Sequence, residues 1–134
     1  MGSYDAYKKL TKAEQDFVKS HPLAAMTFKE DAAKALLEAQ NRFPKETLHN
    51  GQGDAFRHAY WNALMVKHEN YALAKEFADA HETAPGQPAA EMDMDLYNNR
   101  EGRLIAYNNP NATEEELAKL VEKAVQDGKL RTLK

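Results

Sequence analysis

The chain contains no cysteine among its 134 residues. Disulfide bonds, thiolate nucleophiles and zinc sites built on cysteine are therefore excluded. The absence of cysteine does not assign the protein to a compartment, because exported bacterial proteins also avoid this residue. Any catalytic or metal-binding chemistry must rest on other side chains.

Residues that favour β-strands are scarce, with one isoleucine and four valines, whereas alanine, leucine, glutamate and lysine are plentiful. No segment alternates polar and apolar residues over the length of a strand. Both features favour helices. We predict an all-α fold, a single compact domain of about five to six helices, because the length fits one domain with a sizeable core.

Three further absences limit the function. The net charge of -3 gives no strong attraction to nucleic acid, although a local basic pocket remains compatible with it. No apolar run approaches the roughly 18 residues that a membrane span requires. The amino terminus contains no apolar stretch of the kind that a signal peptide has. We therefore expect neither a membrane span nor a strongly nucleic-acid-binding surface.

The opening residues Met1-Gly2-Ser3 are typical of the scar that an expression vector leaves. We expect residues 1–3 to be this scar and residues 4–134 to form one helical domain cut from a longer parent. The parent's localisation cannot be read from the absence of a signal.

Capping residues and prolines predict where the helices begin and end. Thr11 with Glu14, and Thr113 with Glu116, have capping-box spacing. Pro44 ends a long helix, and Gly128 ends the last one. The predicted helices span about residues 12–20, 23–43, 54–68, 70–82, 89–107 and 114–128, and the tail 129–134 is expected to be peripheral.

The most informative segment runs from Asn50 to Asn62, a glycine-punctuated loop that leads into a helix. The helix places Asp54, His58 and Asn62 at i, i+4 and i+8, so the three side chains share one stripe. Arg57 and Trp61, the only tryptophan of the chain, flank this stripe. We interpret the stripe as one wall of a site. The alternative is a solvated helix face on which Asp54 caps the helix.

A second polar group, His81-Glu82, ends the next predicted helix beside a loop, where catalytic groups are often presented. A histidine serves as a general base or metal ligand, and a glutamate orients it, acts as an acid or binds a metal. The alternative for His81 is a favourable interaction with the negative end of the helix dipole.

The third polar group lies on the predicted helix 89–107 and includes Asp95, Asn98, Asn99 and Arg103. Two adjacent asparagines and Gly102 are poor helix formers, so we expect their side chains or their close packing to be needed there. Gly102 would let another backbone or a ligand approach closely. The alternative is an internal polar network that joins helices.

The collected side chains suit hydrolysis by an activated water better than covalent acyl transfer, because no serine or cysteine nucleophile accompanies them. We predict a hydrolase acting on an anionic substrate that bears a phosphate or carboxylate. The alternative is a non-catalytic helical interaction module held together by a buried polar network. The predicted catalytic residues are His58, His81, Glu82 and Asp54, and the predicted substrate-binding residues are Arg57, Trp61, Asn62, Asn98, Asn99 and Arg103.

A divalent metal ion is a candidate cofactor, with His58, His81 and Asp95 as ligands. The spacing of these residues matches no strong metal-binding signature such as HExxH or an EF-hand loop. The sequence therefore leaves the cofactor open.

Three blocks carry a resemblance to a bacterial domain family of unknown function: NGQGDAFRHAYWNAL, AKEFADAHE and MDLYNNREGR. The upstream segment LTKAEQDFVKSHPLAA is also similar to the opening of that family. The resemblance covers about Leu10 to Ile105. The family occurs in secreted, wall-associated and Rhs-type polymorphic-toxin-like proteins.

The resemblance implies an all-helical module and, through its context, a bacterial effector role in a secreted or wall-associated parent. An immunity or carrier protein is the partner class that this context implies. The resemblance implies no particular activity. The positions of this chain that match the family's motifs are the polar residues selected above for their chemistry, together with Gly102.

Overall fold

The computed structural model describes residues 9–134, so the vector scar expected at residues 1–3 lies outside the described part. The described part contains six α-helices and one short 3-10 helix, and it contains no strand. This confirms the predicted all-α fold. No helix in the described part is long and apolar enough to cross a membrane.

The first two helices begin where the capping signals predict. Helix α2 spans Lys12–Ser20, and the side chains of Thr11 and Glu14 form both bonds of its capping box. Helix α3 spans Pro22–Arg42 and starts with proline in its first turn, where no backbone N–H is needed. It ends just before Pro44, and the 3-10 helix η1 follows at Lys45–Thr47.

The remaining helices also follow the predicted bounds closely. Helix α4 spans Gln52–His68, α5 spans Tyr71–His81, and α6 spans Ala89–Tyr107. Asn70 caps α5 by accepting a hydrogen bond from the backbone N–H of Leu73. Helix α7 spans Glu114–Gln126 and begins with the second capping box, formed by Thr113 and Glu116.

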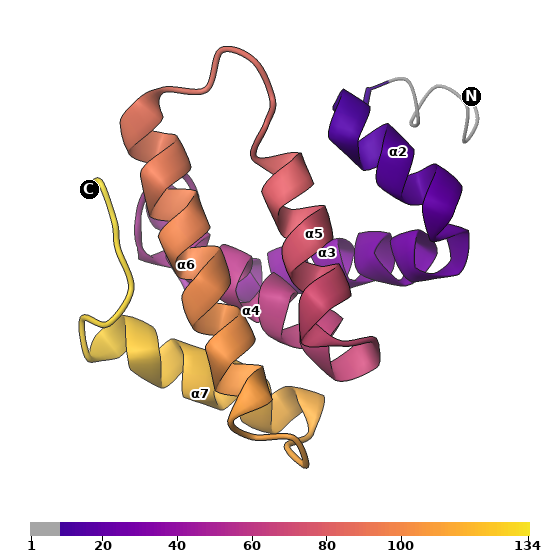
Figure 1. Ribbon diagram of the computed structural model, residues 1–134. Coiled ribbons are helices and arrows are strands. Elements are labelled where there is room, and N and C mark those ends of the chain that lie inside the picture. Colours follow the sequence, from indigo (N-terminus) through magenta and orange to yellow (C-terminus); the bar gives the residue numbers. More distant parts are fainter. Residues whose placement is uncertain (1–8) are drawn as a thin grey trace.

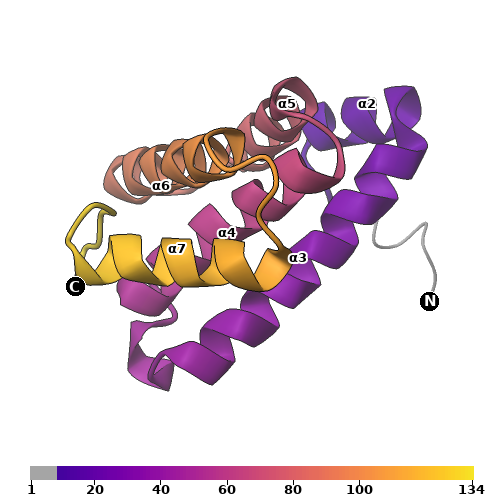
Figure 2. The same cartoon turned by 90° about the horizontal axis from the view of Figure 1, so that it is seen from below.

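Helix α4 is the central helix of the domain. It contacts α3, α5, α6 and α7, and Figure 2 shows it between a layer of α5 and α6 and a layer of α3 and α7. From Gly53 to Met65 every residue except Arg57 is buried. The polar stripe of this helix is therefore covered by neighbouring helices, which is a different environment from a solvated helix face. The largest fully buried apolar side chains of the described part lie on α2, α3, α4 and α7: Phe17, Phe28, Phe56, Tyr60, Leu64, Met65, Leu117 and Val121.

Helix α6 crosses α4 at very short distance because of Gly102. A Cβ at this position would lie 2.0 Å from the backbone oxygen of Ala59 and 2.6 Å from its Cα. No side chain fits there, so the expected close approach at Gly102 is confirmed, with the backbone of α4 as the approaching group. The crossing brings the polar side chains of α6 against those of α4.

The carboxyl-terminal segment lies against α6 rather than projecting from the domain, as Figure 1 shows. Asn98 donates to the backbone oxygen of Arg131 and accepts from its backbone N–H, at 2.9 and 2.8 Å. The backbone N–H of Leu133 donates to the oxygen of Asn50 at 2.7 Å. The tail is peripheral as predicted, since five of the six residues 129–134 are exposed, and these bonds fasten it to α6 and to the loop before α4.

Candidate functional site

The site is built around His58, a buried histidine on the central helix. Its Nδ1 lies 3.0 Å from the backbone oxygen of Asp54 and 3.1 Å from Oδ1 of the same residue. Both partners are acceptors, so Nδ1 carries a proton and donates it. This bond fixes the orientation of the ring and turns Nε2 towards the other helices.

Two acidic side chains from neighbouring helices face Nε2. Oδ1 of Asp95 on α6 lies 3.5 Å away, and Oε2 of Glu82 at the end of α5 lies 3.9 Å away. Both distances exceed a good hydrogen bond. Oδ1 of Asp95 is buried and has no hydrogen-bond partner among the described residues. A buried unpartnered carboxylate oxygen is costly in a folded protein, so this atom is a sign of a site that receives a further group.

The loop before α4 positions Asp54. Asn50 adopts a left-handed backbone conformation with φ 65°, which is uncommon for a residue other than glycine. In this conformation its backbone N–H donates to Oδ2 of Asp54 at 2.8 Å. Arg57 donates to Oδ1 of the same carboxylate at 2.9 Å. Asp54 therefore fastens the loop before α4 and orients His58, whereas the N-cap position is Gly51 and no side chain caps the helix, so the predicted capping by Asp54 is wrong.

The three titrating groups shift each other's pKa. Burial opposes ionisation of Asp54, but the hydrogen bond and charge of His58 outweigh it and hold the pKa of Asp54 well below its usual range. Burial lowers the pKa of His58, but the bond to Asp54 and the charge of Asp95 raise it above the ordinary value. Burial raises the pKa of Asp95 to about 6. The charge of each group favours the ionised form of the other, so the protonation states of Asp95 and His58 are coupled.

Two further polar contacts support this cluster without entering it. Gln87, in the loop before α6, donates to Oδ2 of Asp95 at 2.9 Å. Asn99 donates to Oε2 of Glu82 at 3.2 Å. The bond from Gln87 leaves Oδ1 of Asp95 free to face His58, whereas the bond from Asn99 holds the same oxygen of Glu82 that faces His58. Asn99 could be selected from the sequence because of its poor helix propensity, whereas no pattern in the loop around Gln87 indicated a role for that residue.

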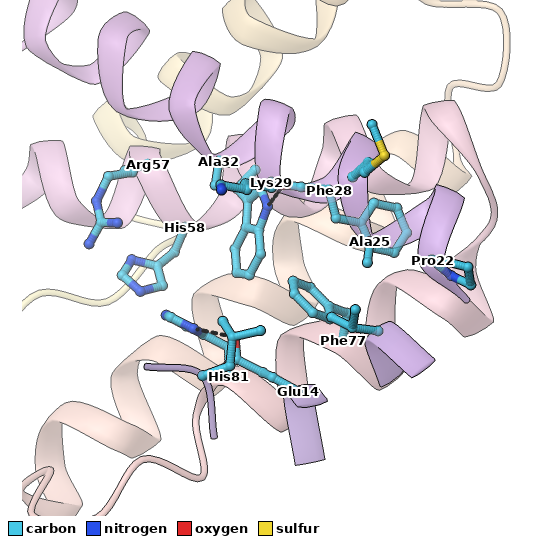
Figure 3. Close-up of a pocket in the computed structure, with 14 residues that line it drawn as sticks. Glu14, Pro22, Ala25, Phe28, Lys29, Ala32, Arg57, His58, Phe77 and His81 are labelled. Atoms are coloured by element: carbon cyan, nitrogen blue, oxygen red, sulfur yellow. Dashed lines mark hydrogen bonds and ion pairs between the residues drawn. The ribbon is translucent and has the colours of Figure 1, made fainter. Parts of the chain in front are cut away.

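A cavity of about 420 Å³ opens beside His58, between α2, α3, α4 and α5. Its wall is mainly apolar, and Trp61, Phe28 and Phe77 contribute aromatic rings. Figure 3 shows the side chains of Arg57 and His58 at one end of this space and Pro22 at the other. Trp61 was a predicted site residue, whereas the apolar residues that α2 and α3 contribute to the wall could not be recognised from the sequence.

His81 lines the same cavity but does not join the carboxylate cluster. Its Nδ1 lies 3.0 Å from Oε2 of Glu14 on α2, and its side chain is 50% exposed. The bond to Glu14 raises the pKa of His81 above its ordinary value. The sequence predicts a role for Glu14 only in the capping box with Thr11. The structure thus brings His58, Asp54, Glu82 and Asp95 together and places His81 on the cavity wall.

The remaining predicted substrate-binding residues lie in the interior. Asn62 donates to the backbone oxygen of His58, and its side-chain oxygen accepts from Nη1 of Arg103, both at 2.9 Å. The guanidinium of Arg103 lies 5.4 Å from the centre of the Tyr71 ring. Asn98 holds the carboxyl-terminal segment. These three side chains join helices and do not line the cavity.

One group of side chains in the described part has the arrangement of a metal site. Asp54, His58 and Asp95 each offer a ligand atom, and these atoms lie within 4.8 Å of one another. One histidine nitrogen and two carboxylate oxygens are ligand types that zinc and manganese accept. The third member is Asp54, whereas the sequence analysis chose His81.

A family model described as "Domain of unknown function (DUF6973)" matches residues 15–129. The chain therefore belongs to this family. The match extends beyond the segment that ends near Ile105 and includes α7. No solved structure matches the chain.

Proposed function

We propose that this domain is a small hydrolase of the bacterial effector type, in which His58 acts as general base. The observation that carries the proposal is the unequal use of the two imidazole nitrogens. Nδ1 is held by Asp54, whereas Nε2 faces an unpartnered oxygen of Asp95 beside a cavity. A base oriented by one carboxylate, with its second nitrogen open, is the arrangement that water activation requires.

The proposed reaction uses Nε2 first as a base and then as an acid. A water molecule loses a proton to Nε2 while its oxygen bonds to a carbonyl or phosphoryl centre. The leaving oxygen takes up the proton as its bond to that centre breaks. Asp54 stabilises the imidazolium through Nδ1, and Asp95 and Glu82 stabilise it from the other side. Arg57, whose side chain is 37% exposed beside the cavity, binds the anionic group of the substrate.

Assistance by a divalent cation is a second form of the same proposal. Asp54, His58 and Asp95 are the ligands that the structure favours, and a bound cation would lower the pKa of its water. Elemental analysis of the purified protein and calorimetric titration with Zn²⁺ or Mn²⁺ test this form. Asp95→Asn is expected to weaken binding at least about tenfold, and His81→Ala to leave it unchanged. Loss of binding in His81→Ala alone would instead favour the set His58, His81 and Asp95.

The effector role and its partner are part of the proposal. The resemblance to domains of secreted and toxin-like proteins suggests that the activity harms a competing cell and that an immunity or carrier protein binds the domain. Expression in bacterial cells tests the role: the wild-type domain should slow growth, and His58→Gln should not. Normal growth with the soluble wild-type domain, both inside the cell and directed to the envelope, would contradict the effector role.

The alternative function, a non-catalytic interaction module, is favoured by one observation. Asn62, Arg103 and Asn98 are buried and bonded within the domain, as expected of a network that fixes helix packing. Under this alternative, substitutions of polar residues reduce function only as far as they reduce stability.

The deciding experiment compares two histidines of the same helix. Hydrolysis of ester and phosphoester substrates is measured for wild type, His58→Gln and His68→Gln, with thermal unfolding followed in parallel. His68 lies far from the cavity and is the matched control. We expect His58→Gln to reduce the rate by about 10²–10⁴-fold, and His68→Gln to leave it nearly unchanged. Equal losses that follow the melting temperatures would favour the interaction module.

A further inference from the structure

We propose that the cavity beside His58 binds the acyl chain of an anionic amphiphile, with the anionic group at the end formed by Arg57 and His58. This inference rests on the proposed function, since it names the substrate class for the same site. The shared chemistry is an unbranched apolar chain that ends in a carboxylate or phosphate. Free amphiphiles and membrane lipids both offer this chemistry.

The shape and lining of the cavity carry the first part of the argument. Its volume of about 420 Å³ lies within the roughly 300–1,000 Å³ of ordinary ligand pockets. Val18, Ala25, Phe28 and Phe77 line it with apolar atoms, and Figure 3 shows this wall extending from the Arg57 end to Pro22. An elongated apolar space suits a chain better than a compact polar substrate such as a sugar or nucleotide.

The charges around the cavity carry the second part. Lys29 and Arg57 line it, together with His58 and His81. Glu14 is the carboxylate in the lining, and its two oxygens accept from His81 and from the backbone N–H of Thr11. The wall is therefore mainly apolar, and it carries the cations Lys29 and Arg57 against one carboxylate, Glu14, which is bonded to His81. This combination complements an amphiphile with a negative head group.

Trp61 provides a direct test because it is the only tryptophan and lines the cavity. A bromine-labelled dodecanoate, used below its micelle-forming concentration, should quench the fluorescence of Trp61 saturably. Bromine-labelled dodecanol, which lacks the charge, should bind about tenfold more weakly. Quenching that does not saturate, or equal binding of the acid and the alcohol, would overturn the proposal.

Two matched pairs of variants locate the binding site. Ala32→Leu fills part of the cavity, whereas Ala33→Leu adds the same atoms to the exposed face of α3. The first should weaken dodecanoate binding about tenfold and the second should not change it. Lys29→Glu should weaken binding roughly threefold to tenfold, and Lys19→Glu, outside the cavity, should have no effect. Equal binding by Ala32→Leu and Ala33→Leu, both folded, would contradict the assignment.

Vesicles distinguish the two sources of the ligand. Quenching by bromine-labelled phosphatidylglycerol vesicles, but not by phosphatidylcholine vesicles, assigns the ligand to anionic membrane lipid. Quenching by monomeric dodecanoate without vesicle binding assigns it to a free amphiphile, and either result supports the shared chemistry.

The failures of the two proposals are separable. If dodecanoate quenches Trp61 in wild type and His58→Gln but no substrate is hydrolysed, the binding inference stands and the hydrolase proposal fails. If a substrate without an acyl chain is hydrolysed and dodecanoate does not bind, the hydrolase proposal stands and the acyl-chain inference fails.

Discussion

Helix α4 carries two histidines that each lie between acidic side chains, and the two arrangements differ in how completely they are bonded. His68 bonds Asp31 through Nδ1 and Glu114 through Nε2, both at 2.8 Å. His58 bonds Asp54 through Nδ1 but lies 3.5 Å from Asp95 on the Nε2 side. The first is a saturated link between α3, α4 and α7, whereas the second has an open position.

The difference teaches which feature separates a structural histidine from a candidate reactive one. His58 and His68 do not differ in the type of their neighbours or in the direction of their pKa shift, since both lie beside carboxylates and both have a raised pKa. The unpartnered oxygen of Asp95 and the adjacent cavity belong to His58. An unsatisfied buried atom beside an accessible space costs stability, and such costs are retained at functional sites.

The largest expected effect concerns the helix crossing that sets the geometry of the His58 cluster. Gly102→Ala places a Cβ against the backbone of Ala59, so α6 must move away from α4. We expect the free energy of unfolding to fall by about 3 kcal/mol, as measured by urea denaturation. Glu101→Ala, the neighbouring position, is the control and should change it by less than about 0.5 kcal/mol. An unchanged stability for Gly102→Ala would mean that the crossing is loose.

The next effect tests whether the saturated histidine stabilises the fold. His68→Ala leaves the buried carboxylate of Asp31 without its imidazole donor. The free energy of unfolding should fall by about 1.5–3 kcal/mol, the usual loss for a hydrogen bond to a charged group. His49→Ala, at an exposed loop histidine, is the control and should change little. Equal midpoints for the two variants would remove the structural role assigned to His68.

In the arrangement around His58, removal of the acidic side chain should not lower the stability of the fold. Burial raises the pKa of Asp95 to about 6, above its ordinary value of 3.8. A raised carboxyl pKa means that stability falls as the pH rises through about 6, so ionised Asp95 destabilises the fold at neutral pH. Asp95→Asn should therefore keep the stability or raise it by about 1 kcal/mol, while hydrolysis is lost. A marked loss of stability would make Asp95 a structural residue like Asp31.

The smallest effect is a pH dependence of the His68 link. Its bonds to Asp31 and Glu114 outweigh burial and raise the pKa of His68. The stabilisation is therefore complete below about pH 6.5, the ordinary value, and is lost as the pH rises through the folded-state value. The stability difference between wild type and His68→Ala should be larger near pH 6 than near pH 9. A difference that grows with pH would show that the charged imidazole does not stabilise the link.

Much of the local structure could be predicted from the sequence. The capping boxes at Thr11 and Thr113 and the break at Pro44 act within a few residues, so they mark helix ends without tertiary information. The same holds for Asp54 and His58, which share a stripe because of helix geometry alone. The close approach at Gly102 was also predictable, because an otherwise unfavourable glycine needs a packing reason.

Contacts between distant segments could not be predicted in this way. Asp95 meets His58, His81 turns to Glu14, and Asn98 binds the backbone of Arg131. The sequence is compatible with several partners for each of these side chains, and the packing of α2, α5 and α6 on α4 determines which partner it contacts. The apolar cavity wall was missed for the same reason, since alanine and phenylalanine at helical spacing indicate only a core.

The sequence by itself determined an all-helical domain, the ends of its helices and the set of polar side chains on α4, because these depend on propensity, capping and helical periodicity. Only the tertiary structure decided which polar side chains remain unsatisfied. Packing saturates His68 and Asn62 on α4 and Asn98 on α6, and it leaves Oδ1 of Asp95 on α6 unpaired beside His58. Hydrogen-bond satisfaction is a property of three-dimensional neighbours, and sequence spacing along one helix does not contain it.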